Sequence, residues 1–200
     1  MTPTTDDAGW PRLALPPRER MTAWQSAIYD SSVAKFGGAY GPRLPLVLAP
    51  ELYRAWAEMS ERLSDADLPA RLRELAILVT ARFWDADFIW FAHAGPAADA
   101  GLDPGTIDRI RAGGPVVGAA DEQAIEGFVT ELLHRHRVGE AVHARAVETL
   151  GARGLVELTA LVGHYTSVAL MLAAHAAPMP VGVDRPLSVP PAVPTEEEQS

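Results

Sequence analysis

The chain has 200 residues, a net charge of −9 at pH 7 and no cysteine. The acidic balance argues against a nucleic-acid partner, because phosphate binding needs a basic patch and the sequence has none. The absence of cysteine excludes disulfides, thiolate nucleophiles and cysteine-ligated metal sites.

The predicted elements begin with a proline-rich extended arm over residues 1–20. A short helix is predicted over 21–32, and a loop rich in glycine and proline follows over 36–45. The next helix begins at Pro50, since proline suits the first turn and the adjacent Glu51 favours the positive helix end.

Two helices are predicted in the middle of the chain. Apolar residues recur at helical spacing over 68–84. Asp85 is the expected N-cap of a second helix over 86–100, and Gly101 occupies the position that ends it. Pro96 lies inside this second helix, so a kink or a break is expected there.

The second half of the chain is also helical. Asp103 as N-cap and Pro104 at the first position begin a helix that ends at Gly113. Three further helices are predicted over 121–138, 139–151 and 154–177. Because no strand alternation appears, the fold class is all-α, a bundle of about seven or eight helices.

The domain organisation follows from these elements. The helical domain spans 21–177, between the N-terminal arm and a proline-rich, acidic tail over 178–200. The apolar run over 158–177 is long enough to cross a membrane, but polar residues interrupt it, so a core or interface helix is predicted. The N-terminus has no apolar signal region, which predicts a cytoplasmic protein without a membrane partner.

One histidine and one glutamate form the main candidate site. His93 shares a helical stripe with Ala86 and Ile89, and Glu74 lies on the preceding predicted helix. Two helices joined by a short connector tend to pack antiparallel, which can bring Glu74 next to His93. A carboxylate fixes the tautomer of a neighbouring imidazole, and such a pair can move protons. A purely structural hydrogen bond is the alternative, and taken alone the spacing favours it.

The segment that contains Glu74 and His93 resembles a known family. The stretch RLRELAILVTARFWDADFIWFAHAGPAADAGLDPGTIDRI is similar to the core of the carboxymuconolactone decarboxylase-like superfamily, which includes the alkyl hydroperoxidase D (AhpD)-like proteins. The resemblance covers about residues 22 to 180. It implies an all-helical, AhpD-like fold that assembles as a homo-oligomer, a trimer or a hexamer.

The resemblance also assigns residues. In the peroxidase branch a glutamate precedes a CxxCxxxH motif, and these positions fall on Glu74 and His93, with the two thiols on Ala86 and Ile89. Both sulfurs are absent, so thiol peroxidase activity is excluded. The decarboxylase branch often has a glutamate where this chain has Ile89, which removes one acid–base group.

The predicted function is therefore a cofactor-independent acid–base enzyme, a lyase of the decarboxylase, isomerase or lactone type. Its substrate is a small carboxylated or lactone-like molecule, and no metal or cofactor is expected. His93 is the predicted catalytic acid–base residue, and Glu74 orients it. A catalytically retired member that binds a ligand or a protein is the alternative. The predicted substrate-binding residues are Trp84, Ile89, Trp90, His164 and Tyr165.

Other polar residues allow further interpretations. His164 and His175 lie on one side of the last helix, where two buried histidines are favoured over a metal site. Tyr40 with Arg43 could contact the carboxylate of a substrate, although a plain turn is favoured. The pair His134 and His136, like Asp85 and Asp87, is interpreted structurally, the histidines as surface residues and the aspartates as helix caps.

Overall fold

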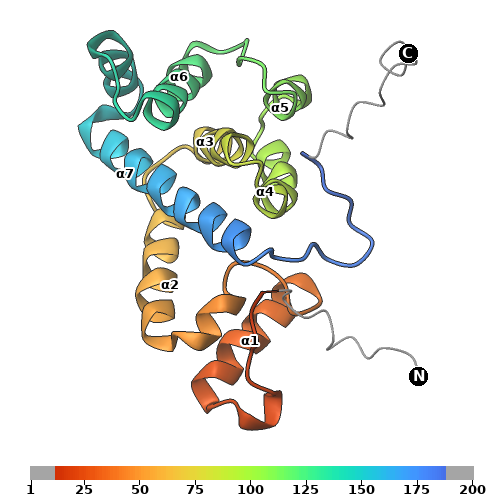
Figure 1. Cartoon of the computed structure of the whole chain (residues 1–200). Helices are drawn as coiled ribbons and strands as arrows, with labels where there is room; N and C mark the ends of the chain where they lie inside the picture. Colours follow the sequence, from red (N-terminus) through yellow and green to blue (C-terminus); the bar gives the residue numbers. More distant parts are fainter. Residues whose placement is uncertain (1–11, 188–200) are drawn as a thin grey trace, which may run out of the picture.

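The structure is a computed structural model that describes residues 12–187. Within this range the chain forms seven α helices and two short 3-10 helices and contains no strand, so the predicted all-α class is confirmed (Figure 1). The elements are η1 (Arg18–Arg20), α1 (Ala23–Phe36), η2 (Leu44–Leu48), α2 (Pro50–Ser64), α3 (Ala70–Phe83), α4 (Asp87–Asp99), α5 (Pro104–Arg111), α6 (Ala120–Arg135) and α7 (Glu140–Ala174).

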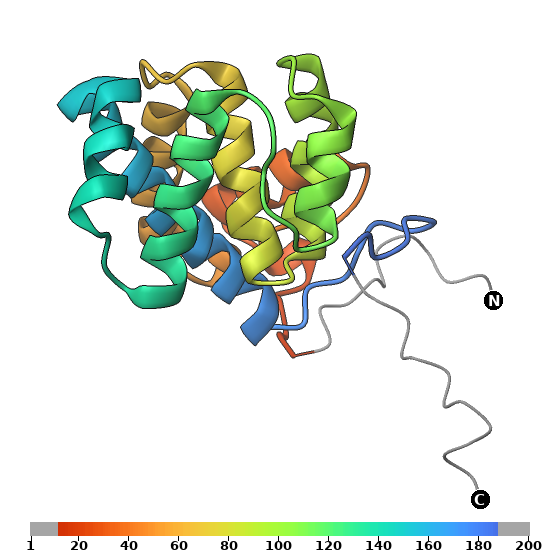
Figure 2. The same cartoon turned by 90° about the horizontal axis from the view of Figure 1, so that it is seen from above.

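Helix α3 lies at the centre of the fold. It packs against α4, α6 and α7 and also meets α5, and Figure 2 shows α3 between α6 and α4. Helices α1 and α2 and the 3-10 helix η2 pack against one another, and α2 also packs on α7. Because α3 is covered on several sides, most of its residues are buried, and most of the buried ones are apolar. The buried residues are Leu72, Glu74, Leu75, Ala76, Ile77, Leu78, Val79, Thr80 and Ala81.

Several helix ends follow the predicted local chemistry. The Asp103 side chain accepts a hydrogen bond from the backbone N–H of Thr106, which confirms it as the N-cap of α5. Gly101 follows α4 with a φ of 91° and Gly113 follows α5 with a φ of 75°. Glycine adopts these left-handed conformations without steric cost, so both helices end at the expected positions.

The predicted N-cap role of Asp85 is wrong. Helix α4 begins after Ala86 without a side-chain cap, and Asp85 instead has a φ of 47°. The N–H groups of Asp85 and Ala86 donate to the carbonyls of Arg82 and Ala81, which is the Schellman arrangement that closes a helix. The Asp85 carboxylate pairs with Arg82. Asp85 therefore ends α3, because the connection is too short to hold a separate cap for α4.

Helix interruptions were also predicted at Pro96 and at Gly151, and the structure shows only the second. Helix α4 continues through Pro96 to Asp99, so the expected break is absent. Gly151 has φ 70° and ψ 170°, which interrupts α7 at the predicted boundary between its two parts. By length and composition α7 could cross a membrane, and 39% of its apolar window is buried. Leu155, Leu158 and Leu161 of its second part are buried in the fold.

The chain after α7 packs back onto the start of α4. The backbone N–H of Leu187 donates to the Asp87 carboxylate over 2.8 Å, and Arg185 pairs with the same carboxylate at 3.2 Å. Leu187 is buried. Asp87, predicted as a helix cap, thus anchors the beginning of the predicted tail. The rest of the tail and most of the predicted arm, residues 188–200 and 1–11, lie outside the described residues.

Candidate active site

Three side chains from three helices form a hydrogen-bonded line. Nδ1 of His93, on α4, lies 2.8 Å from Oε2 of Glu74, on α3. Nε2 of the same ring lies 3.1 Å from the hydroxyl of Tyr165, on α7. Because the carboxylate accepts a hydrogen bond from the Nδ1–H group, the Nε2 atom of a neutral His93 is the acceptor for the Tyr165 hydroxyl. The predicted meeting of Glu74 and His93 is therefore observed, and Tyr165 extends it.

Glu74 is a buried carboxylate with two partners. Its side chain is only 9% exposed, and its other oxygen, Oε1, lies 3.6 Å from Nε of Arg73. These contacts offset the free-energy cost of removing a carboxylate from water. Burial raises the pKa of Tyr165 above its usual range, and the negative charge of Glu74 raises it further. Tyr165 therefore keeps its phenolic proton at neutral pH and can donate a hydrogen bond.

A cavity of about 500 Å³ opens beside this line. The His93 side chain is 22% exposed, so a small molecule that enters the cavity can reach the imidazole. The cavity lies among α1, α2, α3, α4 and α7, and His93, Glu74, Tyr165 and His164 all line it. Its remaining charged residues are Lys35, Arg43, Glu61, Asp65 and Arg73.

A smaller side cavity of about 80 Å³ shares His93, His164 and Tyr165 with the main cavity. Ile89, which the resemblance places at a thiol position of the peroxidase branch, lines this side cavity. The His164 ring lies 5.3 Å from the ring of Trp56, and burial lowers the pKa of His164, which favours the neutral imidazole. The other apolar lining residues are Phe36, Pro42, Tyr53, Ala57, Phe88, Ala92 and Val168.

Sequence patterns assign no function to Lys35 and only a minor role to Arg43. Both line both cavities, although they lie far from His93 in the chain. Lys35 is the last basic residue of α1, and Arg43 immediately precedes η2. No local motif marks them, and the only available signal was that Lys35 is the single lysine of the chain.

Two of the predicted substrate-binding residues do not reach these cavities. Trp90 is 1% exposed and lies in the core, where its indole N–H has no hydrogen-bond partner among the described residues. Trp84 is at the surface and donates a 3.2 Å hydrogen bond to Thr166. Trp84 follows the last residue of α3 and lies outside α4, whereas Trp90 points about 100° away from its neighbour Ile89 around α4.

The histidines outside this line occupy ordinary positions. His134 and His136 are exposed, as predicted. His175 lies at the C-terminal end of α7 and does not line the cavities that contain His164. In the part of the chain that the structure describes, no three histidine or acidic residues cluster in a way that could hold a metal ion.

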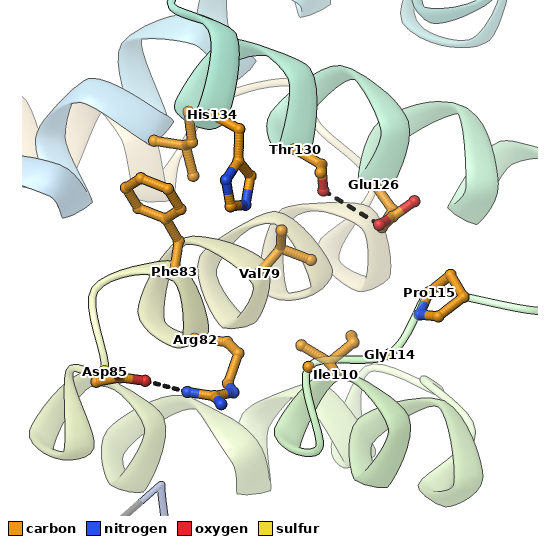
Figure 3. A pocket seen from close by; sticks show the side chains of 12 residues that line it. Val79, Arg82, Phe83, Asp85, Ile110, Gly114, Pro115, Glu126, Thr130 and His134 are labelled. Atoms are coloured by element: carbon orange, nitrogen blue, oxygen red, sulfur yellow. Dashed lines mark hydrogen bonds and ion pairs between the residues drawn. The ribbon is translucent and has the colours of Figure 1, made fainter.

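A second cavity, of about 550 Å³, lies on the opposite face of α3 (Figure 3). Helices α5 and α6 and the loop between them close it, with His134 and Glu126 contributed by α6. Its polar groups mostly bind one another: Arg82 pairs with Asp85, and Glu126 accepts a 3.1 Å hydrogen bond from Thr130. The His134 ring packs edge-on against Phe83. Among the described residues that line this cavity, His134 forms no hydrogen-bonded line like the one at His93.

Comparison with known proteins supports the fold. Residues 50–129 match the profile of the Carboxymuconolactone decarboxylase family. The chain is similar in structure to the alkylhydroperoxidase AhpD core of an uncharacterized peroxidase-related protein from Ralstonia eutropha JMP134, with a TM-score of 0.68 and 16% identity over 82% of this chain and 90% of that one. The chain is also similar in structure to an uncharacterized peroxidase-related protein from Silicibacter sp. TM1040. The TM-score is 0.66 and the sequence identity is 16%, over 86% of this chain and 92% of that one. No curated protein matches the sequence.

The fold and the site define an all-helical protein of AhpD-like architecture with a His–Glu pair at the junction of α3 and α4. Residues 50–129 are similar to the Carboxymuconolactone decarboxylase family, and the fold of the described chain is AhpD-like. It has no cysteine, so the thiol chemistry of the peroxidase branch has no reacting group here.

Proposed function

We propose that this protein is an acid–base enzyme that acts on a small carboxylated or lactone-like organic molecule by proton transfer at His93. The observation that carries the proposal is the line from Glu74 through His93 to Tyr165, which ends in a cavity large enough for a small substrate. A positioned acid or base of this kind contributes roughly 10²–10⁴-fold to a rate.

Each group of the line has a defined task. Glu74 holds the ring by accepting from Nδ1, so Nε2 exchanges the proton. When His93 is protonated, Nε2 donates to the Tyr165 oxygen, and the phenolic proton is then free to bond to an oxygen of the substrate. The raised pKa of Tyr165 keeps the phenol protonated for this task.

The reaction class is the formation and protonation of an enolate. Either a C–H bond next to a carbonyl loses its proton to His93, or a C–CO₂⁻ bond breaks and its electron pair enters the neighbouring carbonyl. In both cases Tyr165 stabilises the enolate oxygen. In isomerisation His93 returns to carbon the proton that it removed, whereas in decarboxylation a protonated His93 donates a proton to carbon and is then reprotonated by water. Decarboxylation releases carbon dioxide and isomerisation moves the proton, so one set of residues serves both.

The test is solvent isotope exchange, which needs no knowledge of the final product. Carboxylated lactones and 3-keto acids are incubated with the protein in deuterated water, and deuterium uptake at carbon and loss of carbon dioxide are followed by nuclear magnetic resonance. We expect catalysed exchange or decarboxylation, lowered by at least about a hundredfold in His93→Gln. A folded His93→Gln protein with an unchanged rate removes His93 from the mechanism.

The same assay separates the enzyme from the alternative, a retired member of the family that only binds a ligand or a protein. Ile89 favours that alternative, because it places an isoleucine at a thiol or glutamate position of relatives and lines the side cavity. Ligand binding without any catalysed exchange or decarboxylation would support it.

The proposal also covers the cellular location and the oligomeric state of the protein. We infer a cytoplasmic homo-oligomer, a trimer or hexamer, that has neither a membrane nor a nucleic acid as its partner. Large apolar side chains exposed on α1, η2 and α2 provide surface for subunit contacts; they are Trp24, Leu48, Leu52 and Met59. Light scattering of the purified protein measures the assembly directly.

A further inference from the structure

Two cations lie together at the wall of the candidate site without a negative partner. Lys35 and Arg43 line both the main and the side cavity. Neither forms an ion pair with a carboxylate in the described part of the chain. Partial burial and the positive charge of Arg43 lower the pKa of Lys35. Two neighbouring like charges repel each other, and an anion placed between them removes that cost.

The charges that line the side cavity favour an anionic ligand over a cationic one. Lys35 and Arg43 are its only charged lining residues, apart from any charge on His93 or His164, and none of its lining residues is acidic. In the main cavity, by contrast, Glu61, Asp65 and Glu74 are also present. A carboxylate bound at the boundary of the two cavities therefore meets two cations, whereas an ammonium group at the same place is repelled.

Most of the remaining wall of the side cavity is aromatic or aliphatic. The rings of Phe36 and Phe88 meet edge to face at 4.9 Å, and Trp56 packs against His164. Ile89 and other aliphatic side chains complete the wall. A volume of about 80 Å³ suits one apolar group, such as a short alkyl chain or part of a ring, and the main cavity takes the remainder of the molecule.

We propose that Lys35 and Arg43 bind the carboxylate of an apolar monocarboxylic acid, aromatic or alicyclic, whose apolar part lies against Phe36, Trp56 and Phe88. This inference rests on the proposed function, since it names the substrate class of the same site. It also places the carbon next to the carboxylate close to His93 and Tyr165, which line the same cavities.

The test measures binding of benzoate and cyclohexanecarboxylate to the full chain by calorimetry at neutral pH. Lys35→Gln and Arg43→Gln should each weaken binding at least about tenfold, because each removes a charge-assisted hydrogen bond. Arg82→Gln removes a cation from the second cavity and should leave the Kd unchanged. Methyl benzoate, which has the same ring without the charge, should bind at least about tenfold more weakly than benzoate.

Each result decides between the two proposals. The inference fails if neither acid binds at millimolar concentration, if Lys35→Gln and Arg43→Gln bind as the wild type does, or if the ester binds equally well. Benzoate binding that depends on both cations and persists in His93→Gln supports the inference. If such binding is found but no proton exchange occurs in the wild type, the proposed function fails while the carboxylate site stands.

Discussion

The two large cavities lie on opposite faces of α3 and have similar volumes, about 500 Å³ for the one at His93 and about 550 Å³ for the one at His134. Each contains a histidine, a glutamate and an arginine. In the cavity at His134, Arg82 is paired with Asp85, and Glu126 is bonded to Thr130 on its own helix. In the cavity at His93, the glutamate and the histidine come from different helices and form a continuous line with Tyr165.

This difference teaches that volume and composition do not identify the site. A proton-transfer site needs a ring whose two nitrogens have distinct tasks, and Glu74 and Tyr165 assign them for His93. The cavity at His93 also holds two cations, Lys35 and Arg43, that form no ion pair with a carboxylate in the described part of the chain. The exposed His134 packs edge-on against Phe83, an arrangement that orders the ring without fixing its proton.

The sharpest test of the comparison removes one hydroxyl from each cavity. Tyr165→Phe should lower catalysed exchange by about a hundredfold, since it removes the donor to the substrate oxygen. Thr130→Val, which removes the hydroxyl that binds Glu126, should leave the exchange rate unchanged. Initial rates and circular dichroism of both variants check this prediction. Equal losses in the two variants would mean that the cavities do not differ in function.

Exchanging a carboxylate for an amide in each cavity gives the next largest effect. Glu74→Gln should lower activity by about tenfold or more, because a charge-assisted hydrogen bond to His93 is replaced by a neutral one. Glu126→Gln should have no effect on activity. Nitrogen chemical shifts of the imidazole supply an independent readout. They should show the His93 proton distributed over both ring nitrogens in Glu74→Gln but held on Nδ1 in the wild type.

Acid stability should depend on one histidine and not on the other. Burial lowers the pKa of His164, so below the ordinary value of 6.5 the unfolded chain takes up a proton that the folded chain does not. The stability associated with neutral His164 is therefore present above that pH and lost as the pH falls.

Urea unfolding at about pH 7.5 and about pH 5.5, on either side of the ordinary histidine pKa, measures this difference. His164→Gln should lose less stability between the two conditions than the wild type does. His134→Gln, at an exposed position, should lose as much as the wild type. A larger acid-induced loss in His164→Gln would contradict the assignment of neutral, buried His164.

The smallest effect is expected from the ion pair in the cavity at His134. The Asp85 side chain is 72% exposed and its partner Arg82 is 26% exposed, so Asp85→Asn should change the free energy of unfolding by at most about 1 kcal/mol. Activity should be unchanged. Thermal unfolding and the exchange assay check both statements. A large loss of activity would show that the second cavity communicates with the first.

Local patterns in the sequence predicted much of the helical framework. Apolar spacing predicted α3, Asp103 with Pro104 predicted the start of α5, and Gly151 marked the interruption of α7. These features depend on residues within one or two turns, so neighbouring side chains and backbone conformation are sufficient to specify them. Asp85 was misassigned because the same residue type suits an N-cap and a left-handed helix end, and the length of the connector decided between them.

Local sequence patterns predicted only part of the candidate site. Glu74 and His93 lie on consecutive helices joined by a short connection, so their meeting could be anticipated from the sequence and from the resemblance to the family. Trp84 and Trp90 could not be placed, because the direction of a side chain depends on which helix face meets the core.

The sequence by itself determined an all-helical chain, a glutamate–histidine pair and the impossibility of thiol chemistry. Only the tertiary structure decided that Tyr165 completes the line and that Lys35 and Arg43 line the same cavities without a carboxylate partner among the described residues. These residues come from α7, α1 and the loop before η2. Contacts between such distant segments arise from the packing of whole helices, which no local pattern of residues encodes.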